Sequence, residues 1–305
     1  MAPFLALVGP TASGKTEAGL AIAEAIGAEI LSVDSMLVYR RMDIGTAKPT
    51  AAQRARVPHH LLDLVDPSEP FSVAAFQAAA HDAADDVRRR GMQPLLVGGS
   101  GLYLRAVVDE LEFPGTEPET RNALEQEASA LGAVRMYRRL AELDPVAASK
   151  IEPGNVRRIV RALEVAAITG RPFSSFAAAW DSYWPEHMRA VGIRLGREAL
   201  AIRVEARVQE MITNGWVDEV RDLVERGFGG WLTASKAIGY AELARHLSGE
   251  LSLEDAVRQT VKRTRTLARR QMAWFHRDPR IRWFQVEVDG PLRVVDGMVT
   301  YLEGG

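Results

Sequence analysis

A glycine-rich segment near the N-terminus carries the residues best suited to hold phosphate groups. The segment "GPTASGKT" follows the apolar run "FLALV". Backbone N–H groups of such a loop, with the first turn of the following helix, present donors and a positive dipole to an anion. The Lys15 side chain can neutralise phosphate charge, and the Thr16 hydroxyl can coordinate Mg²⁺. The sequence therefore predicts a polyphosphate site, with Thr16 as the metal ligand, formed by Gly9, Pro10, Thr11, Ala12, Ser13, Gly14, Lys15 and Thr16.

The acidic residues that usually accompany this loop in nucleotide hydrolases are missing. Those enzymes carry an acidic Mg²⁺ ligand at a second strand end and a residue that positions water. Here the apolar run "PLLV" continues into "GGSG", which contains Ser100 and no carboxylate. The only acid at a predicted strand end in this part of the chain is Asp34, in "SVDSM". The carboxyl ends of strands in a doubly wound sheet share one crevice, so we expect the loop, Asp34 and Ser100 to converge.

Asp34 has three possible roles at this position. It can cap a helix or turn, because aspartate favours helix N-caps. It can hold Mg²⁺ indirectly, as in small-molecule kinases, or it can act as a general base toward an acceptor that faces the phosphates. The residues alone leave all three open.

Arginines are the candidates for contacts with phosphate and RNA. Arg203 and Arg207 lie four apart, and each is either a surface ion pair or a group that stabilises departing charge. The segment "NVRRIVRALEV" places Arg158 and Arg161 on one helix face, with Ile159 and Val160 on the buried side. A second basic stretch is nearly free of acidic neighbours in the sequence and ends in an aromatic pair, which favours a phosphate- or RNA-facing role over a solvated face. That stretch contains Arg258, Lys262, Arg263, Arg265, Arg269, Arg270, Arg277, Trp274 and Phe275.

The elements that position these residues alternate in the N-terminal part of the chain. Short apolar runs at 4–8, 28–33 and 94–99 alternate with helical patterns at 15–26 and 72–90. Such alternation predicts an α/β fold with a parallel sheet covered on both faces. Residues 119–180 read as helices only, whereas 189–195 and 280–288 read as strands that flank helices near 198–226, 235–246 and 252–277. We therefore expect a core formed by 1–113 and 186–305, and a helical insertion over 114–185.

The composition excludes several classes of protein. The chain has 305 residues, a formal net charge of −2 and no cysteine, so it has no disulfide, thiol nucleophile or cysteine-ligated zinc, which suits a reducing cytoplasm. No apolar run approaches a membrane span, and "FLALV" reads as a strand and not as a signal peptide. The pair His59-His60 lacks metal-ligand spacing and is expected to be an ordinary core or surface feature.

Several stretches together resemble the bacterial tRNA dimethylallyltransferases. They cover nearly the whole chain: "GPTASGKT", "DSMLVYRRMDIGTAKP", "VPHHLLD", "LLVGGSGLYLRA", "NVRRIVRALEV", "AIGY" and "TRTLARRQMAWF". The resemblance implies a P-loop-kinase-like core with a helical insertion that grips the tRNA anticodon stem-loop. It also implies a cytoplasmic monomer that moves the dimethylallyl group of dimethylallyl diphosphate, with Mg²⁺, to N6 of the adenosine just 3′ of the anticodon.

The resemblance also assigns roles to individual residues. Asp34 is the expected general base, because the adenine amine must lose its proton as it attacks. Lys15, Ser100 and Arg207 are the expected catalytic donors to the departing diphosphate. The residues expected to contact tRNA are Asp34, Ser35, Met36, Leu37, Ser100, Arg121, Arg157, Arg158, Ile159, Val160 and Arg161.

The sequence departs from the family pattern at three of these positions. Leu37 and Arg157 stand where the family commonly has glutamine, and Ser100 stands where it commonly has threonine. The leucine puts a hydrogen bond to the RNA in doubt, the arginine favours a phosphate contact in place of base reading, and the serine keeps a hydroxyl. Three other functions remain open: a P-loop small-molecule or nucleotide kinase, which would bind ATP; an isopentenyltransferase for free adenine nucleotides; and a non-enzymatic RNA-binding protein.

Overall fold

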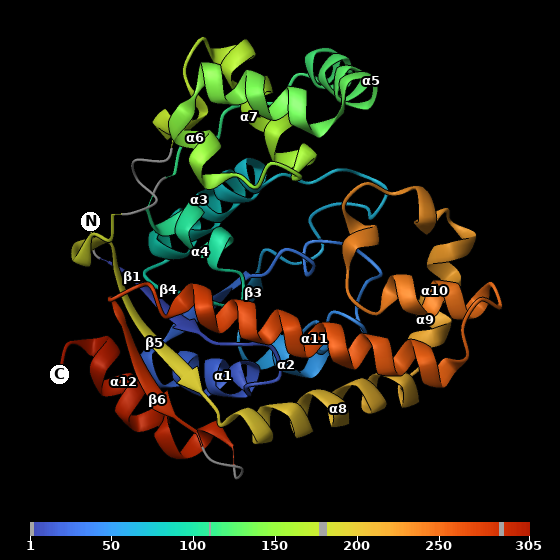
Figure 1. Cartoon of the computed structure of the whole chain (residues 1–305). Coiled ribbons are helices and arrows are strands. Elements are labelled where there is room, and N and C mark those ends of the chain that lie inside the picture. The colour runs from blue at the N-terminus through green and yellow to red at the C-terminus, as the bar shows by residue number, and fades with distance from the viewer. Residues whose placement is uncertain (1–2, 110, 177–181, 287–289) are drawn as a thin grey trace. The chain divides into compact units, whose positions relative to one another are not determined.

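The chain folds into two compact units. The computed structural model describes residues 3–109, 111–176, 182–286 and 290–305. Unit 1 comprises Met1–Val108 and Trp184–Gly305, and unit 2 comprises Asp109–Tyr183 (Figure 1). The sequence pattern predicts this division with the helical insertion over 114–185, close to the limits of unit 2.

Unit 1 is built around a six-stranded sheet in which every described strand pair is parallel. The strands lie in the order β3-β2-β4-β1-β5-β6, so the chain crosses over between neighbours. The α/β fold with a parallel, P-loop-like core is thereby confirmed. The strands are β1 (Phe4–Val8), β2 (Ala28–Val33), β3 (His59–His60), β4 (Gln93–Gly98), β5 (Met188–Arg194) and β6 (Ile281–Gln285).

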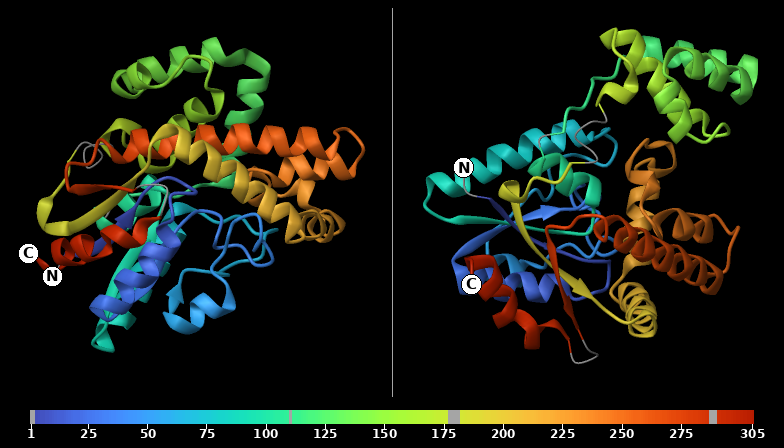
Figure 2. Two further views of the ribbon diagram at one scale, coloured as in Figure 1. Left: turned by 90° about the horizontal axis from the view of Figure 1, so that it is seen from below. Right: turned by 60° about the vertical axis from the view of Figure 1, so that its left-hand side comes forward.

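Alternate residues of the strands feed two separate hydrophobic clusters, one on each face of the sheet. Leu5 and Leu7 pack with α1 (Lys15–Ile26) and α12 (Val295–Glu303). Ala6 and Val8 pack on the opposite face with α3 (Val73–Arg89) and α4 (Gly101–Val108). Figure 2 shows these two helical layers from other directions. Both faces are covered, which explains why the strands read as continuous apolar runs.

The C-terminal half of unit 1 adds helices beyond the sheet. They are α8 (Arg197–Thr213), α9 (Trp216–Glu225), α10 (Tyr240–Leu247) and α11 (Leu253–Phe275). The expectation of one helix over 198–226 is wrong. Gly215 has a φ of 94°, a left-handed conformation that ends α8 and starts α9 in a new direction.

Some elements were not predicted from the sequence. They are β3, α2 (Ala51–Arg56), α4 and α12. The two-residue strand and the six-residue helix are too short to carry a periodic pattern. The predicted strand over 280–288 is present as β6, and its last expected residues lie outside the described part of the chain.

Unit 2 is helical throughout its described secondary structure. It contains α5 (Pro118–Leu143), α6 (Pro145–Lys150) and α7 (Val156–Thr169), and Gly132 breaks α5 with a φ of 77°. Its core includes Met136, Leu140 and Leu163, and it shares no residue with the two clusters of unit 1. Each unit therefore has its own hydrophobic core.

None of the helices in the described ranges combines the length and the apolar character needed to cross a lipid bilayer.

Candidate active site

The phosphate loop connects the end of β1 to the start of α1, at the carboxyl edge of the sheet. Ala12 and Gly14 have left-handed φ values of 62° and 91°. A non-glycine residue in this region is strained, and such strain is common in loops that aim N–H groups at a ligand. The Ser13 hydroxyl is buried and has no hydrogen-bond partner among the residues that the structure describes. The loop therefore has the conformation of an anion-binding loop, and the Ser13 hydroxyl can form a hydrogen bond to a bound anion.

Lys15 folds back onto this loop. Its Nζ donates a hydrogen bond to the Pro10 carbonyl oxygen at 2.6 Å. Burial of the ammonium group, with the nearby positive charge of Arg207, lowers the pKa of Lys15 to about 7, although Asp34 opposes the shift. The free loop thus holds a lysine that is partly neutral at physiological pH, and a bound anion would restore its charge.

Two cavities meet beside the loop. The first, of about 740 Å³, is lined by residues 11–16 of the loop and by residues of β2, α2, α8 and the segment that follows Asp34. The second, of about 420 Å³, is lined by Ser100, by α8 and α11, and by residues 236–238. Asp34, Arg207 and Gln271 line both cavities. These side chains therefore stand where the two cavities join.

Asp34 directly follows β2. Its Oδ1 accepts a hydrogen bond from the Met36 backbone N–H at 2.8 Å, which is a turn-capping contact. Burial raises the pKa of Asp34 above its usual range, while the N–H groups of Met36 and Leu37 and the charge of Lys15 act in the opposite direction. The carboxyl group therefore caps its own turn and also sits in a cavity where its proton affinity is increased, as a general base requires.

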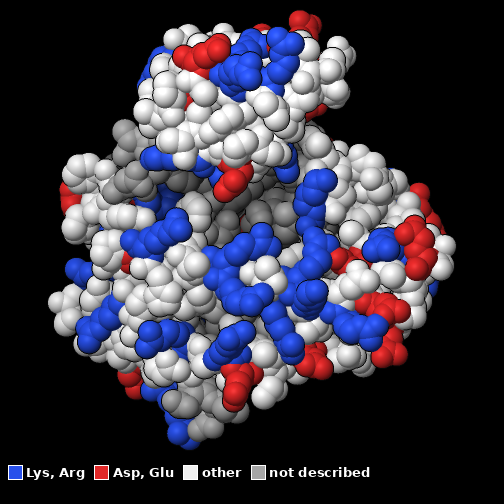
Figure 3. Space-filling view, viewed as in Figure 1, with Lys and Arg blue, Asp and Glu red and all other residues white. Residues whose placement is uncertain are grey.

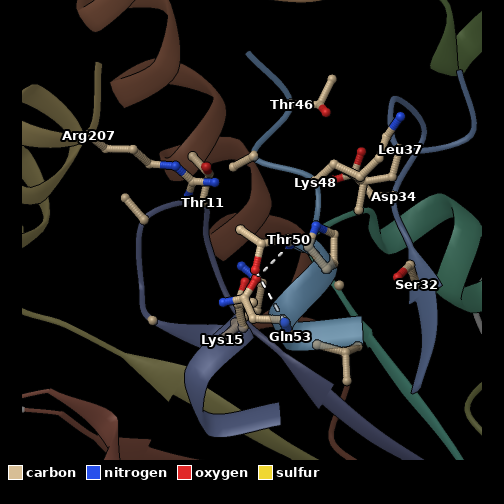
Figure 4. Close-up of a pocket in the computed structure, with 18 of the residues that line it drawn as sticks. Thr11, Lys15, Ser32, Asp34, Leu37, Thr46, Lys48, Thr50, Gln53 and Arg207 are labelled. Atoms are coloured by element: carbon tan, nitrogen blue, oxygen red, sulfur yellow. Dashed lines mark hydrogen bonds between the residues drawn. The ribbon is translucent and has the colours of Figure 1, made fainter. Parts of the chain in front are cut away.

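Arg207 and Arg203 reach the site from α8, which crosses near the loop. Figure 4 shows Arg207 extending from α8 toward Thr11, with Asp34 and Leu37 across the cavity. The Arg203 Nη1 donates to the Ser13 carbonyl oxygen at 3.4 Å. Arg203 therefore contacts the phosphate loop itself, while Arg207 lies between both cavities. Both arginines can stabilise negative charge there.

The remaining predicted residues of unit 1 separate between the two cavities. Ser100 precedes α4 and lines the second cavity, together with Ser35 and Met36. Leu37, which was expected to contact tRNA, lines the first cavity together with the phosphate loop and does not line the second. The residue pair Asp34 and Ser100 is brought together because β2 and β4 are neighbours in the sheet.

A further part of the lining of the first cavity was not predicted from the sequence. It includes Thr46, Lys48, Thr50 and Gln53 from the segment "IGTAKPTAAQ" (Figure 4). The Lys48 side chain is 1% exposed and donates to the Tyr39 carbonyl, to Asp43 and to Asp63 at 2.5–2.7 Å. The three hydrogen bonds of this buried lysine hold the segment in place, so we assign Lys48 a structural role.

Glu219 of α9 fixes the same segment from far along the chain. Its carboxylate accepts hydrogen bonds from the backbone N–H groups of Asp43, Ile44 and Gly45 at 2.8, 2.7 and 3.2 Å. It also accepts one from the Tyr240 hydroxyl at 2.7 Å. No sequence signal links positions 43 and 219, so only the fold reveals this clamp.

Gln271 connects α11 to the phosphate loop. Its Oε1 accepts a hydrogen bond from the Thr11 N–H at 2.8 Å. A Cβ atom at Gly99 would lie 2.6 Å from Gln271 Nε2, and one at Gly101 would lie 1.8 Å from Trp274. The glycines after β4 thus let α11 approach the loop closely. Gln271 lies in "ARRQM", a stretch that the sequence analysis singled out only for its charges.

The basic helix α11 is less free of acids than its sequence indicates. Arg263 pairs with the buried Glu242 of α10, Arg265 pairs with Glu205 of α8, and Arg258 pairs with Asp255. Figure 3 shows Lys and Arg side chains gathered over the middle of one face, where α11 runs in the matching view of Figure 1. The helix therefore uses some of its cations to pack and presents others to solvent.

The arginines predicted for RNA contact in unit 2 have mixed surroundings. Arg121 and Arg161 both pair with Glu164, whose side chain is fully buried. These cations also offset the cost of burial at Glu164 and lower its pKa. Arg157 and Arg158 are exposed at the start of α7. Two arginines thus stabilise the unit, and two remain accessible.

The structure corrects the expectation for Ile159 and Val160. Their side chains are 0% and 3% exposed and belong to the core of unit 2. Helix α7 turns the side chains of these positions inward, because they follow its apolar stripe. An RNA contact by either side chain is therefore not available in this conformation.

The two histidines each contact a neighbouring oxygen atom. His60 contacts Glu29 at 2.6 Å and His59 contacts the Val57 carbonyl oxygen at 2.7 Å. Within the described ranges, no three acidic, histidine or cysteine side chains gather to hold a metal ion. Mg²⁺ commonly keeps waters and takes its other ligands from substrate phosphates, so the donor set of Thr16 and Asp34 in one cavity fits this ion.

The parallel sheet, the phosphate loop and the paired cavities define a P-loop α/β protein built to handle a phosphorylated substrate. Comparison with known families is more specific. The chain matches the family described as IPP transferase over residues 37–278, and the one described as isopentenyl transferase over residues 3–62. It belongs to the IPP transferase family.

Individual relatives agree with this assignment. The chain is 50% identical to a tRNA dimethylallyltransferase of Kineococcus radiotolerans, covering 92% of this chain and 90% of the relative. It is 46% identical to the enzyme of the same name from Desulforudis audaxviator, with 99% and 98% covered. Among solved structures it is similar to the tRNA isopentenylpyrophosphate transferase of Bacillus halodurans, with a TM-score of 0.72, 36% identity, and 100% and 96% covered.

A second solved structure supports the fold alone. It is a eukaryotic dimethylallyltransferase acting on tRNA, with a TM-score of 0.81 at 24% identity, covering 98% of this chain and 77% of that one.

Proposed function

We propose that this protein transfers the dimethylallyl group of dimethylallyl diphosphate to N6 of the adenosine immediately 3′ of the anticodon in tRNA, releasing diphosphate. One observation supports this function above the others: Asp34 and Arg207 line both the cavity of the phosphate loop and the cavity beside it. A base and a phosphate-stabilising cation thus stand between two substrate-sized spaces, as a transfer reaction requires.

The donor binds with its diphosphate in the loop. The loop N–H groups, Lys15 and the Ser13 hydroxyl hold the phosphate oxygens. The Thr16 hydroxyl would hold Mg²⁺ at these phosphates, and the ion would supply positive charge to the departing diphosphate. Arg203 and Arg207 stabilise the same charge from α8. The Ser100 hydroxyl, which lines the second cavity, donates a hydrogen bond to the departing diphosphate.

The acceptor adenosine leaves its stack and enters the second cavity, as bases must when an enzyme modifies them. Its N6 lone pair forms a bond to the first carbon of the dimethylallyl group, the bond from that carbon to the phosphate oxygen breaks, and the N6 proton passes to Asp34. No water is consumed, so the site needs no residue that positions water.

Each unit carries cations that are suited to phosphate contacts with the tRNA. Arg157 and Arg158 of unit 2 are exposed. In unit 1, Lys262 and Arg269 of α11 are exposed and form no ion pair with any residue that the structure describes. We further propose that the protein acts as a monomer in the cytoplasm. Leu37 lies in the first cavity, so its replacement of the family's common glutamine is expected to affect the donor side.

Two other functions are less well supported. A kinase would place ATP in the loop and a small hydroxyl acceptor at Asp34. An isopentenyltransferase for free adenine nucleotides would share the loop and Asp34 but would have no use for the exposed cations of α11. The names of the relatives agree with neither.

One assay separates these functions. The protein is incubated with Mg²⁺, dimethylallyl diphosphate and either unmodified tRNA or AMP, and the nucleosides are analysed by mass spectrometry. Dimethylallyl-adenosine that forms only from tRNA is the expected result. Product from AMP, or phosphate transfer from ATP to an acceptor, would contradict the proposal.

A further inference from the structure

The junction segment, residues 43–46, lies where the two cavities join. Asp43 and Ile44 line the first cavity, Gly45 lines the second, and Thr46 lines both. The segment belongs to "DIGTAKP", a stretch that the sequence analysis singled out but to which the proposed reaction gives no role. The junction segment therefore forms part of the wall at the point where donor and acceptor must meet.

The Glu219 carboxylate of α9 holds the junction segment by its backbone. Its Oε2 accepts hydrogen bonds from the N–H groups of Asp43 and Ile44 at 2.8 and 2.7 Å. Its Oε1 accepts one from the Gly45 N–H at 3.2 Å and one from the Tyr240 hydroxyl at 2.7 Å. Successive N–H groups that converge on an anion form an oriented binding site, and hydrogen bonds to a charged acceptor are stronger than those between neutral groups. Both carboxylate oxygens thus have two donors each.

Two glycines let the junction segment and the start of α10 pack directly against Trp216 of α9. The Trp216 side chain is 1% exposed. A Cβ atom at Gly45 would lie 2.0 Å from its Nε1, and one at Gly239 would lie 2.0 Å from its Cη2. The Tyr240 ring meets Trp216 edge-on, with ring centroids 5.6 Å apart. The stretches "DIGTAKP" and "AIGY", which are far apart in the sequence, therefore meet at α9 with no space for a further side chain.

This contact joins the two sides of the proposed reaction site. The chain runs from Asp34, at the end of β2, into the junction segment. Arg207 lies on α8, which Gly215 connects to α9 and hence to Glu219. Glu219 thus links the segment that follows the proposed base to the helices that carry the proposed diphosphate-stabilising cation. A displacement of about 1 Å between reacting groups can lower a rate roughly 100-fold.

We propose that Glu219 is a positioning residue of the transfer reaction: by holding the junction segment, it fixes Asp34 and Arg207 relative to each other where the two cavities join. The inference rests on the proposed function, because it takes these two side chains as the groups that act on the substrates. Glu219 lines neither cavity, so it acts through the junction segment and has no part in proton transfer.

Glu219→Gln in the full chain tests this role. Glutamine offers one acceptor oxygen, and its NH₂ group would face donors that the carboxylate accepts. With saturating dimethylallyl diphosphate and an anticodon stem-loop RNA, the single-turnover rate constant is expected to fall by about 10- to 100-fold. The calorimetric affinity for inorganic diphosphate should stay near that of the unaltered protein, because Gln271 and α1 still hold the phosphate loop. A purely stabilising role would lower the melting temperature without changing this rate constant at temperatures below it.

Tyr240→Phe removes a single donor and leaves the carboxylate in place. Burial, with the charge of Glu219, raises the pKa of Tyr240 well above its usual range, so the hydroxyl stays protonated and can donate. Its loss is expected to slow single turnover about 5-fold. The double variant should be no slower than Glu219→Gln, because both changes act on one contact. Glu225→Gln is the control, since this exposed residue of α9 undergoes the same chemical change and lines neither cavity.

The outcomes distinguish this inference from the proposed function. If the unaltered protein fails to modify the stem-loop, the proposed function is wrong. If it modifies the stem-loop and Glu219→Gln keeps the original rate constant, the function stands and the inference is wrong. A loss of diphosphate affinity in proportion to the loss of rate would also overturn the inference. Should Glu219→Gln fail to fold, an unchanged rate constant in Tyr240→Phe would overturn it.

Discussion

Lys15 and Asp34 line the same cavity, and burial shifts the pKa of each side chain toward its neutral form. Both shifts are the reverse of what a strong ion pair would produce. In the free protein, the charged form of each group therefore carries a desolvation cost in free energy. A bound phosphate beside Lys15 and a cation beside Asp34 would offset that cost.

Replacing Asp34 tests the general base. Asp34→Asn keeps the shape of the side chain and can still accept a hydrogen bond from the Met36 N–H, but it cannot take a proton. We expect the single-turnover rate to fall by about 10²- to 10⁴-fold, with tRNA affinity retained. A near-normal single-turnover rate would exclude Asp34 as the base.

The same variant should not lose stability. A carboxyl group whose folded pKa is raised binds its proton more tightly in the folded state, so its ionisation at higher pH weakens folding. At neutral pH Asp34→Asn is therefore expected to melt at the same temperature as the unaltered protein or higher.

In the unaltered enzyme, the rate should decline with falling pH from a point above the usual range of a carboxyl group.

Lys15 allows a prediction about protons. With a pKa of about 7 in the free protein, Lys15 is mostly neutral at pH 8, and a bound diphosphate should return its charge. Calorimetric titration of diphosphate in buffers with different ionisation enthalpies should show uptake of about one proton at pH 8. Lys15→Met should bind diphosphate weakly and take up none. Equal uptake by both proteins would place the titrating group elsewhere.

At the scale of elements, helix α11 connects a basic surface of unit 1 to the phosphate loop. The glycines after β4 let α11 lie close to the loop. The Gln271 side chain then accepts a hydrogen bond from the Thr11 backbone N–H. The loop is thus held at its start by a helix far along the chain, while its end is held by α1.

Gln271→Leu should loosen the start of the loop. Loss of one hydrogen bond to a partly buried N–H is expected to cost about 1 kcal/mol, or roughly a 5-fold weaker diphosphate affinity. Gln259→Leu makes the same change on α11 at a position that lines neither cavity, and it serves as the control. Affinity for the stem-loop RNA should be similar in both variants. Diphosphate binding that is unaffected in Gln271→Leu would show that the contact does not support the loop.

At the scale of the whole molecule, the separation into two cores predicts separate stabilities. The clusters of unit 1 and the core of unit 2 share no residue. The lining of both cavities comes from unit 1 alone. Donor binding should therefore survive damage to unit 2, whereas tRNA modification should not.

Leu140→Ala removes a fully buried side chain from unit 2 and should destabilise that unit by about 2–5 kcal/mol. Hydrogen exchange should increase over 109–183 while diphosphate binding by calorimetry stays unchanged and tRNA affinity falls. Leu96→Ala is the comparison, because Leu96 is a fully buried residue of the sheet in unit 1. This variant should lose both diphosphate binding and tRNA affinity. Loss of diphosphate binding in Leu140→Ala would show that the units are energetically coupled.

The sequence alone determined the features that depend on local order. The phosphate loop, the strands that follow a continuous apolar pattern, α1, α3 and the change to helices near residue 114 all leave a signal within a short window. The location of Asp34 could also be predicted, because an acid directly after a buried strand lies at the carboxyl edge of a parallel sheet.

Only the tertiary structure decided which distant residues meet. Glu219 clamps positions 43–45, Gln271 holds Thr11, and Glu242 and Glu205 neutralise arginines of α11. The burial of Ile159 and Val160 likewise depends on how α7 packs. Such contacts join residues that are separated along the chain by many turns of other elements. They have no periodicity or spacing of their own, so the physical information that specifies them exists only once the sheet and its helices have packed.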